Sequence, residues 1–368
     1  MDKNKRLTVW LPVIIAASIA LGIFIGNHYL SISQGKKRSY SSGNKINAIL
    51  DIIDEQYVDT VSMSKLVEST IPKIFSELDP HSVYIPAEDA SVVNEELEGS
   101  FSGIGVSFNM QTDTILVISV ISGGPAEKAG LLPFDRIISI NDSIFSGKKK
   151  NQGEIMKTLR GAKNSTVKLG VQRGNSPELL YFDVTRGDVP VNSVDVSYEA
   201  AKGIGYIKVS KFARNTYNEF ITAIAKLKQA GCTSFVIDLR GNTGGYMDAA
   251  INMINEFMPE GRLIVYTEGK SFPRSDVYAN GTGTCKDAPI VVLTDEISAS
   301  ASEIFSGAIQ DNDRGTIIGR RTYGKGLVQT QMSLSDGSEM RLTIARYYTP
   351  SGRCIQKKYE MGNTDAYD

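Results

Sequence analysis

Residues 234–257 read SFVIDLRGNTGGYMDAAINMINEF. The stretch begins with a short apolar run, residues 234–239, which predicts a buried strand, and it ends with residues 246–257, which predict a helix. The turn between them, residues 238–245, is rich in glycine. Glycines at a strand-to-helix crossing let backbone N–H groups face a ligand, so this turn favours an anion or oxyanion site over a plain tight turn.

Strands and helices alternate from residue 203 onward, on both sides of this stretch. We expect further strands at 204–209 and 290–294, and helices at 216–230 and 300–310. A hairpin signal, Ser335-Asp-Gly337, then joins two more strands, at 328–334 and 339–348. Alternation of this kind implies an α/β layer arrangement.

Residues 98–186 follow a different pattern. We expect short strands here, at 106–108, 115–120, 136–140, 167–173 and 179–185. Two short helices, at 125–130 and 152–160, lie between them, which gives a small β-rich module. A chain of 368 residues with these parts is predicted to be a multidomain α+β protein.

The first thirty residues differ from an otherwise ordinary composition. Lys3, Lys5 and Arg6 precede twenty residues without a charge, residues 7–26. About 20 apolar residues span a bilayer, and positive charge stays on the cytoplasmic side. Residues 1–30 therefore predict a cytoplasmic tip and an uncleaved transmembrane signal-anchor, with the body of the chain outside. A cleaved signal peptide, whose apolar region is shorter, is the alternative.

Two segments separate this anchor from the β-rich module. Residues 31–43 are polar and rich in Ser and Gly, which predicts a flexible stalk. Residues 44–97 form a helical region, because two amphipathic patterns occur there. Such a helical pair is too small to form its own core. We expect it to pack on the body or on another copy of itself.

The net charge, the spacing of the cysteines and the small number of histidines argue against several functions. A net charge of −1 gives no electrostatic reason to expect nucleic acid as a partner. The three cysteines, Cys232, Cys285 and Cys354, match no metal site and are expected to be unpaired thiols rather than a disulfide and a free thiol. We expect no metal and no other cofactor. Only two histidines, His28 and His81, are present, so a Ser-His-Asp hydrolase has almost no way to form.

A serine-rich helix start, Ser298-Ala-Ser300-Ala-Ser302-Glu303, offers a nucleophile that needs no histidine. A hydroxyl at a strand-to-helix junction lies beside free backbone N–H groups and the positive end of the helix dipole, and both suit an oxyanion. The plain alternative is that Ser300 and Glu303 form a capping box that only starts the helix.

Lys325 lies 25 residues after Ser300, in a Gly-Lys-Gly turn. A lysine can replace histidine as the general base if burial lowers its pKa toward neutrality. Gln329 can orient the amine without holding it protonated as a carboxylate would. The alternatives are a solvated lysine, an ordinary exposed glutamine, and a phosphate-binding loop over residues 319–325. That loop lacks the Ser or Thr that must follow its lysine.

These motifs together resemble the carboxyl-terminal processing peptidases, also called tail-specific proteases. The resemblance covers roughly residues 44–356 and is carried by residues 235–245, the Ser-Ala-Ser-Ala-Ser-Glu run and Thr322-Tyr-Gly-Lys-Gly-Leu-Val-Gln329. It implies a PDZ domain at residues 98–186. It also implies an α/β serine peptidase core, crotonase-like and of the ββα type, at residues 187–356. Residues 357–368 are then a polar tail, and because many members continue past it, we expect a short form or a fragment.

The resemblance also implies the active-site residues. In that family the serine 25 residues before the lysine is the nucleophile, which implies Ser300. Lys325 is then the general base, and Gln329 orients it. The oxyanion hole is implied to use the N–H groups of Ala301 and Gly244.

The β-rich module contains the stretch that implies peptide binding, Phe101-Ser-Gly-Ile-Gly-Val106. It is similar to the loop that captures a terminal carboxylate while a strand edge pairs with the peptide. This implies binding by Phe101, Ser102, Gly103, Ile104, Gly105 and Val106. Phe134 departs from the family, which usually has Gly there. Residues 79–84 match the family's segment before the PDZ domain, which gives His81 a structural role.

The function that follows is a serine endopeptidase that cleaves partly unfolded or tail-exposed proteins and recognises their free C-terminus. With the anchor, we expect a single-pass protein of the bacterial inner membrane with its catalytic body in the periplasm, and a homo-oligomer through residues 44–97. Two rivals remain, a catalytically silent PDZ scaffold and an esterase or amidase that acts on small substrates.

Overall fold

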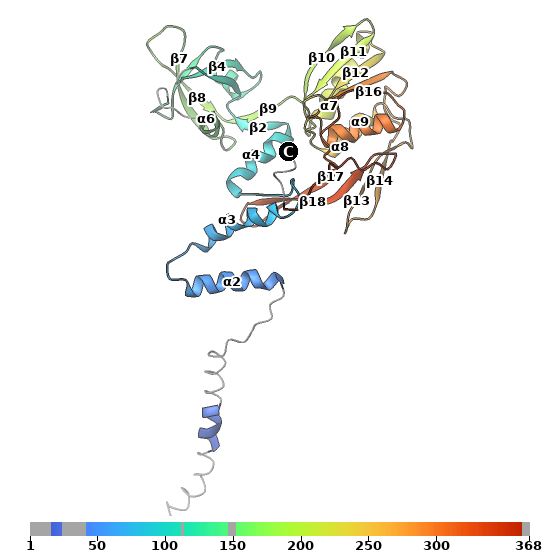
Figure 1. Cartoon of the computed structure of the whole chain (residues 1–368). Coiled ribbons are helices and arrows are strands. Elements are labelled where there is room, and N and C mark those ends of the chain that lie inside the picture. The colour runs from blue at the N-terminus through green and yellow to red at the C-terminus, as the bar shows by residue number, and fades with distance from the viewer. Residues whose placement is uncertain (1–15, 24–41, 112–113, 146–151, 363–368) are drawn as a thin grey trace, which may run out of the picture. The chain divides into compact units, whose positions relative to one another are not determined.

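The computed structural model describes residues 16–23, 42–111, 114–145 and 152–362 (Figure 1). The chain divides into two compact units, Met1–Thr70 and Ile71–Asp368, and each is described by itself. Of the predicted anchor, only the helical residues 16–23 are described; the rest of it, and nearly all of the predicted stalk, lie outside the described residues. Within the ranges described, no helix is both long enough and apolar enough to cross a bilayer.

The first unit contains helix α2, Ser42–Gln56, and the first part of α3, Met63–Ser76. Both occur where apolar residues recur with helical spacing, so the two predicted helices are confirmed. The predicted helical region, residues 44–97, also contains a short strand that was not predicted, β1, Val83–Ile85, followed by helix α4, Ala87–Glu98. Strand β1 forms because it pairs with a distant strand, β18, Glu339–Tyr348.

The β-rich module is confirmed as a six-stranded sheet with the order β3-β4-β5-β7-β8, in which β6 pairs with β5. Every pair in it is antiparallel. Helices α5, Pro125–Ala129, and α6, Gln152–Leu159, accompany the sheet. A separate two-stranded ladder joins β2, Ser100–Gly103, to β9, Gly187–Pro190. The strands of the large sheet are β3 Val106–Gln111, β4 Thr114–Val120, β5 Arg136–Ile140, β6 Ser143–Ile144, β7 Thr166–Gln172 and β8 Leu180–Thr185.

The α/β part of the chain is built on a five-stranded sheet with the order β10-β11-β12-β15-β16. Its last four strands are parallel, which fits the predicted α/β layer arrangement, and β10 is an antiparallel edge strand that was not predicted. Helices α7, Thr216–Gln229, α8, Met247–Asn255, and α9, Ala301–Asp311, pack on this sheet (Figure 1). The strands are β10 Val194–Ala201, β11 Ile204–Val209, β12 Ser234–Asp238, β15 Ile290–Thr294 and β16 Thr316–Gly319.

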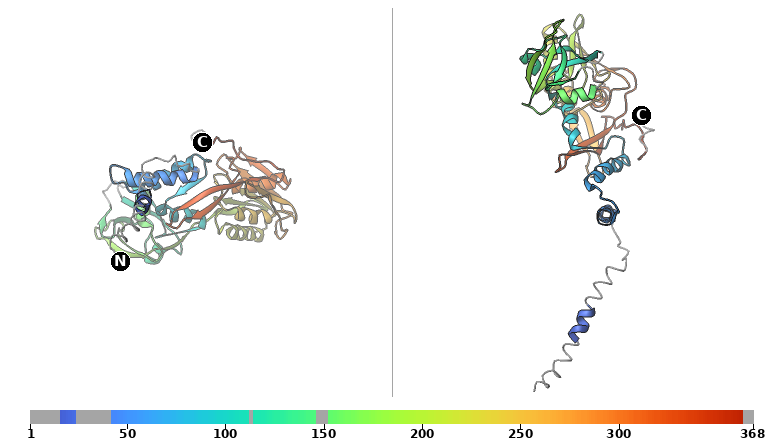
Figure 2. Two further views of the ribbon diagram at one scale, coloured as in Figure 1. Left: turned by 90° about the horizontal axis from the view of Figure 1, so that it is seen from below. Right: turned by 90° about the vertical axis from the view of Figure 1, so that its left-hand side faces the viewer.

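A second five-stranded sheet contains the C-terminal hairpin, which appears in orange-red in Figure 2. The hairpin joins β17, Leu327–Ser333, to β18 through the predicted turn, and the sheet order is β1-β18-β13-β14 with β17 also paired to β18. Strands β13, Leu263–Glu268, and β14, Ser275–Tyr278, were not predicted. The three cysteines are free thiols; Cys232 and Cys285 are buried, and Cys354 is exposed.

Candidate active site

The glycine-rich turn begins at Asp238, a buried carboxylate at the end of β12. The Tyr206 hydroxyl donates to its Oδ2 at 2.6 Å, and Nη2 of Arg240 donates to the same oxygen at 2.6 Å. Burial by itself raises the pKa of Asp238, but the hydrogen bonds from Arg240 and Tyr206 outweigh it and hold that pKa at about 2. The start of the turn is therefore fixed by a charged, fully paired group.

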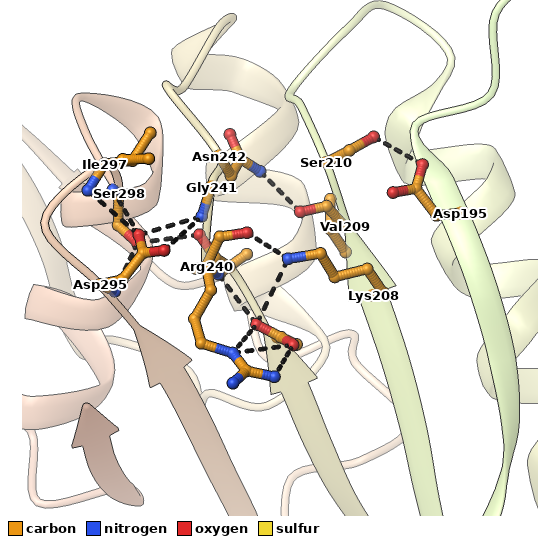
Figure 3. Close-up of polar contacts among 12 residues, drawn as sticks. Asp195, Lys208, Val209, Ser210, Arg240, Gly241, Asn242, Asp295, Ile297 and Ser298 are labelled. Carbon is orange, nitrogen blue, oxygen red and sulfur yellow. Dashed lines mark hydrogen bonds and ion pairs between the residues drawn. The ribbon is translucent and has the colours of Figure 1, made fainter. Parts of the chain in front are cut away.

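Two further side chains fix the rest of the turn, as Figure 3 shows. The N–H of Gly241 donates to both carboxylate oxygens of Asp295, at 3.0 and 2.9 Å. Asn242, which is fully buried, donates from Nδ2 to the carbonyl of Val209 at 3.0 Å. Its Oδ1 accepts the N–H of Gly244 at 2.8 Å. The Gly244 N–H, which was expected to serve an oxyanion hole, is thus already hydrogen-bonded in this conformation.

Gly244 nevertheless lies directly against the serine-rich helix start. A Cβ atom built on it would lie 2.8 Å from Cβ of Ser300 and 3.0 Å from the backbone nitrogen of Ala301. Its φ of +103° is also one that residues with a side chain rarely adopt. Only glycine permits this approach, so the two segments that the sequence singled out separately are in contact.

The three serines of this run have different surroundings. Ser298 and Ser302 are fully buried, and their hydroxyls donate at 2.9 Å to the carbonyls of Leu239 and Asn242. Ser300 is half-buried. Two hydroxyls are therefore structural, and the third is the one with exposed surface.

Ser300 lies immediately before α9, with φ of +54° and ψ of −113°. A positive φ is uncommon for a residue other than glycine, and such strain tends to be kept at functional sites. Ala301 is the first residue of the helix, where backbone N–H groups have no partner within the helix. This is the local geometry that an exposed nucleophile beside an anion-stabilising donor requires.

Glu303 joins this helix start to the lysine turn. Its carboxylate, 2% exposed, accepts the N–H of Ser300 at 2.9 Å, the reciprocal bond of the predicted capping box. It also accepts the N–H groups of Gly324 at 2.7 Å and Lys325 at 2.8 Å. Burial raises the pKa of Glu303 above its usual range, and these hydrogen bonds together with one from Thr322 oppose that rise.

Tyr347 forms a second bridge between the two segments. Its hydroxyl lies within hydrogen-bond distance of the carbonyls of Ser300, at 3.1 Å, and of Lys325. The backbones of the expected nucleophile and of the expected base are therefore held together on two sides. Sequence patterns gave no signal for Tyr347, and they indicated only the capping part of what Glu303 does.

Lys325 is half-buried, and its Nζ donates to Oε1 of Gln329 at 3.0 Å. Burial lowers the pKa of Lys325 below its usual range, and the charge of Arg341 lowers it further. The carboxylates of Asp79 and Glu303 act in the opposite direction and raise this pKa. The net shift is downward, which is the direction a lysine needs to serve as a base near neutral pH.

A separate pocket, with a volume of about 230 Å³, lies in the β-rich module. It is bounded by edge strand β3 on one side and by helix α6 on the other. The guanidinium of Arg160 lies 4.5 Å from the ring centroid of Phe101 and pairs with Glu95 at 3.5 Å. Four of the six expected carboxylate-loop residues line the pocket, and Ser102 and Gly103 do not. The lining is Phe101, Ile104, Gly105, Val106, Ser107, Phe108, Met156, Leu159 and Arg160.

No group of three His, Cys, Asp or Glu side chains in the described part of the chain is arranged to hold a metal ion.

Comparison with known proteins shows which family the chain resembles in sequence. Residues 203–364 match peptidase family S41, and residues 102–195 match a PDZ domain. Over 318 residues the chain is 35% identical to the carboxy-terminal processing protease CtpB of Bacillus subtilis strain 168, covering 86% of this chain and 66% of that relative. Over 365 residues it is 33% identical to a probable CtpA-like serine protease of Staphylococcus aureus strain N315, covering 97% and 72%.

A solved structure, that of the photosystem II D1 C-terminal processing protease, is also similar. It shares 28% identity, covers 86% of this chain and 91% of that chain, and gives a TM-score of 0.48. The two family matches and the two relatives compared by sequence define a serine-type peptidase with a PDZ domain. The chain belongs to peptidase family S41, among the C-terminal processing proteases.

Proposed function

We propose that this chain is an endopeptidase with a catalytic dyad of Ser300 and Lys325. The observation that carries the proposal is the pair of bridges, through Glu303 and Tyr347, that joins the strained helix start to the lysine turn. The downward shift of the Lys325 pKa, caused first by burial, supports it, because it is the direction in which an amine becomes a better proton acceptor near neutral pH.

The reaction follows from these groups. Neutral Lys325 takes the proton of the Ser300 hydroxyl as its oxygen attacks the scissile carbonyl. The resulting ammonium gives that proton to the leaving amine, and a water molecule then hydrolyses the acyl-enzyme by the same route. Gln329 orients the amine throughout, because its Oε1 accepts a hydrogen bond from Nζ.

The oxyanion would bind at the start of α9. The N–H of Ala301 is the first donor of the proposed hole, at the positive end of the helix dipole. Gly244 supports a second donor, since it lies against Ser300 and Ala301. Its N–H would have to be shared with Oδ1 of Asn242, or released from it, when substrate binds.

The same proposal assigns substrate choice to the PDZ module. An extended peptide would add to edge strand β3, and its terminal carboxylate would be captured by backbone N–H groups of the Phe101–Val106 stretch. The apolar lining of the pocket favours an apolar last side chain. Substrates would then be partly unfolded or tail-exposed proteins, which alone present a free C-terminus in extended form.

We also propose a location and an assembly. The twenty uncharged residues 7–26, preceded by three basic residues, support a single-pass anchor in the bacterial inner membrane with the catalytic body in the periplasm. The exposed apolar side chains of α2, such as Ile46, Ile49 and Ile52, support association of the helical region with a second copy.

Incubation of the purified full-length protein with a reduced, unfolded protein tests the central assignment, with fragments identified by mass. Ser300→Ala and Lys325→Ala should each abolish cleavage. The matched controls Ser275→Ala and Lys270→Ala, both at exposed positions, should cleave normally. Cleavage by Ser300→Ala at the wild-type rate would show a different nucleophile. Deletion of the PDZ module distinguishes the proposed endopeptidase from an esterase or amidase that acts on small substrates, because the turnover of such an enzyme would not change.

A further inference from the structure

The segment before β1 contains a turn, Asp79–Ser82, whose role in the site has not been assigned. Asp79 is 8% exposed, and its Oδ1 accepts the N–H groups of His81 and Ser82, both at 3.0 Å. Its Oδ2 accepts the hydroxyl of Ser82 at 2.5 Å. One buried carboxylate thus fixes the backbone of the whole turn, including the carbonyl of His81.

The turn is attached to β18 at Thr343. The Thr343 hydroxyl donates to Oδ1 of Asp79 at 3.0 Å, and the Thr343 N–H donates to the Ser82 hydroxyl at 3.1 Å. Thr343 is also the residue that pairs with Gln329 across the β17–β18 ladder, next to a register shift. A bulge re-aims the side chains beside it. The turn and Gln329 therefore meet at the same point of the sheet.

Gln329 connects the turn to Lys325. Its Nε2 donates to the carbonyl of His81, and its Oε1 accepts from Nζ of Lys325 at 3.0 Å. A carbonyl can only accept, so the His81 carbonyl has to face the amide nitrogen. That requirement leaves Oε1 for the lysine. Without this carbonyl the amide could rotate and present N–H donors to the amine.

We infer that the turn Asp79–Ser82 is a positioning element of the active site. Its His81 carbonyl fixes the orientation of the Gln329 amide and thereby holds the Lys325 amine in line. This role rests on the proposed function of Lys325 as general base. The His81 side chain is not what the argument uses, since the contact comes from the backbone.

Charge and geometry have to be separated in the test. The charged groups that act on Lys325 are Arg341 of β18, Glu303 of α9 and Asp79 of the turn itself. Asp79→Asn removes a negative charge and disturbs the turn. Ser82→Ala keeps the charge and removes one of the two links between Asp79 and Thr343, while the direct bond from the Thr343 hydroxyl to Asp79 remains.

The experiment compares kcat and KM of the full-length protein and these two variants on one peptide substrate. Each variant should lose about tenfold or more in kcat, with KM changed less than about twofold. The matched control is Asp336→Asn. Asp336 binds the N–H and hydroxyl of Ser338 in the same way, at 3.0 and 2.6 Å, but at the exposed tip of the hairpin. This control should retain the wild-type kcat. Thermal midpoints confirm that each variant is folded at the assay temperature.

A double-mutant cycle with Gln329→Ala shows whether the turn acts through the amide. In the Gln329→Ala background, adding Ser82→Ala should lower kcat by less than about twofold, because the amide that the turn orients is absent. An equal loss in both backgrounds would overturn the inference, as would a wild-type kcat for both turn variants. If Lys325→Ala itself remains active, the proposed function fails. If Lys325→Ala is inactive but both turn variants keep the wild-type kcat, the positioning role fails and the proposed function stands.

The pH profile provides a readout that loss of folding would not move. Asp79 raises the pKa of Lys325, so Asp79→Asn should shift the acid limb of kcat/KM to lower pH. Reduced stability alone would lower the plateau and leave the midpoint of that limb in place.

Discussion

Oε2 of Glu303 accepts the backbone N–H of Lys325 at 2.8 Å, from the first turn of the helix that Ser300 begins. The same oxygen accepts the N–H of Ser300 at 2.9 Å. A single buried carboxylate oxygen thus sets the spacing between the two segments on which the proposed chemistry depends. Its position holds the backbones of Ser300 and Lys325 together, as the proposed dyad requires.

Glu303→Gln should therefore reduce activity strongly, although glutamine has nearly the same shape as glutamate. An amide has one acceptor oxygen, so it cannot accept all three backbone N–H groups. Each lost bond to a charged group costs about 1.5–3 kcal/mol, which corresponds to a fall in kcat of roughly 10- to 100-fold. Steady-state kinetics measure this. Glu296→Gln, at an exposed carboxylate paired with Arg320, is the control and should match the wild type.

Arg341→Gln should move the pH dependence of activity in a defined direction. The positive charge of Arg341 lowers the pKa of Lys325, so its removal raises that pKa. The neutral amine then forms only at higher pH, and the acid limb of kcat/KM should shift to higher pH. Arg274→Gln, at an arginine paired with Asp276 in the β13–β14 hairpin, should not shift it. A shift of the Arg341→Gln limb to lower pH would contradict the role of Lys325 as base.

Gly244→Ala should abolish activity. The new Cβ would lie 2.8 Å from Cβ of Ser300, at a φ of +103°. Gly231→Ala is a matched control, because Gly231 has a φ of +94° but nothing within 4 Å of the added atom. It should remain active, with a stability loss of about 1–2 kcal/mol from the backbone conformation alone. Denaturant unfolding and peptide cleavage are measured on both variants. Together they separate the effect of the unfavourable backbone φ from that of the contact between the added Cβ and Ser300.

A free substrate carboxylate should matter only when the PDZ module is present. A peptide with a free, apolar C-terminus should be cleaved faster than its C-terminal amide, because the amide lacks the charge that backbone N–H groups capture. Deletion of residues 98–186 should remove this preference. Equal cleavage of both peptides by the intact protein would contradict recognition through the terminal carboxylate.

Local sequence patterns predicted most of the fold that positions the site. The strand, turn and helix of residues 234–257 follow directly from apolar spacing and glycine placement, and β12 and α8 occur there. Strand β1 was missed because three residues, Val83–Ile85, carry no periodic signal and are extended only by pairing with β18. Such long-range pairing has no local signature.

The candidate site was only partly predictable for the same reason. Spacing gave Ser300 and Glu303 as a capping box, and this bond is present. Spacing could not show that Glu303 also reaches the lysine turn, since that contact depends on how α9 packs against a segment far along the chain. The N–H of Gly244 was expected to be available, but Asn242, two residues earlier in the same turn, accepts it.

Covalent labelling by an organophosphonate that mimics an acylating substrate is the most direct test of the dyad. Peptide mapping by mass spectrometry should find the phosphonyl group on Ser300 in the wild-type protein, and labelling should be almost absent in Lys325→Ala. A label on another residue, or equally rapid labelling of Ser300 without Lys325, would contradict the account.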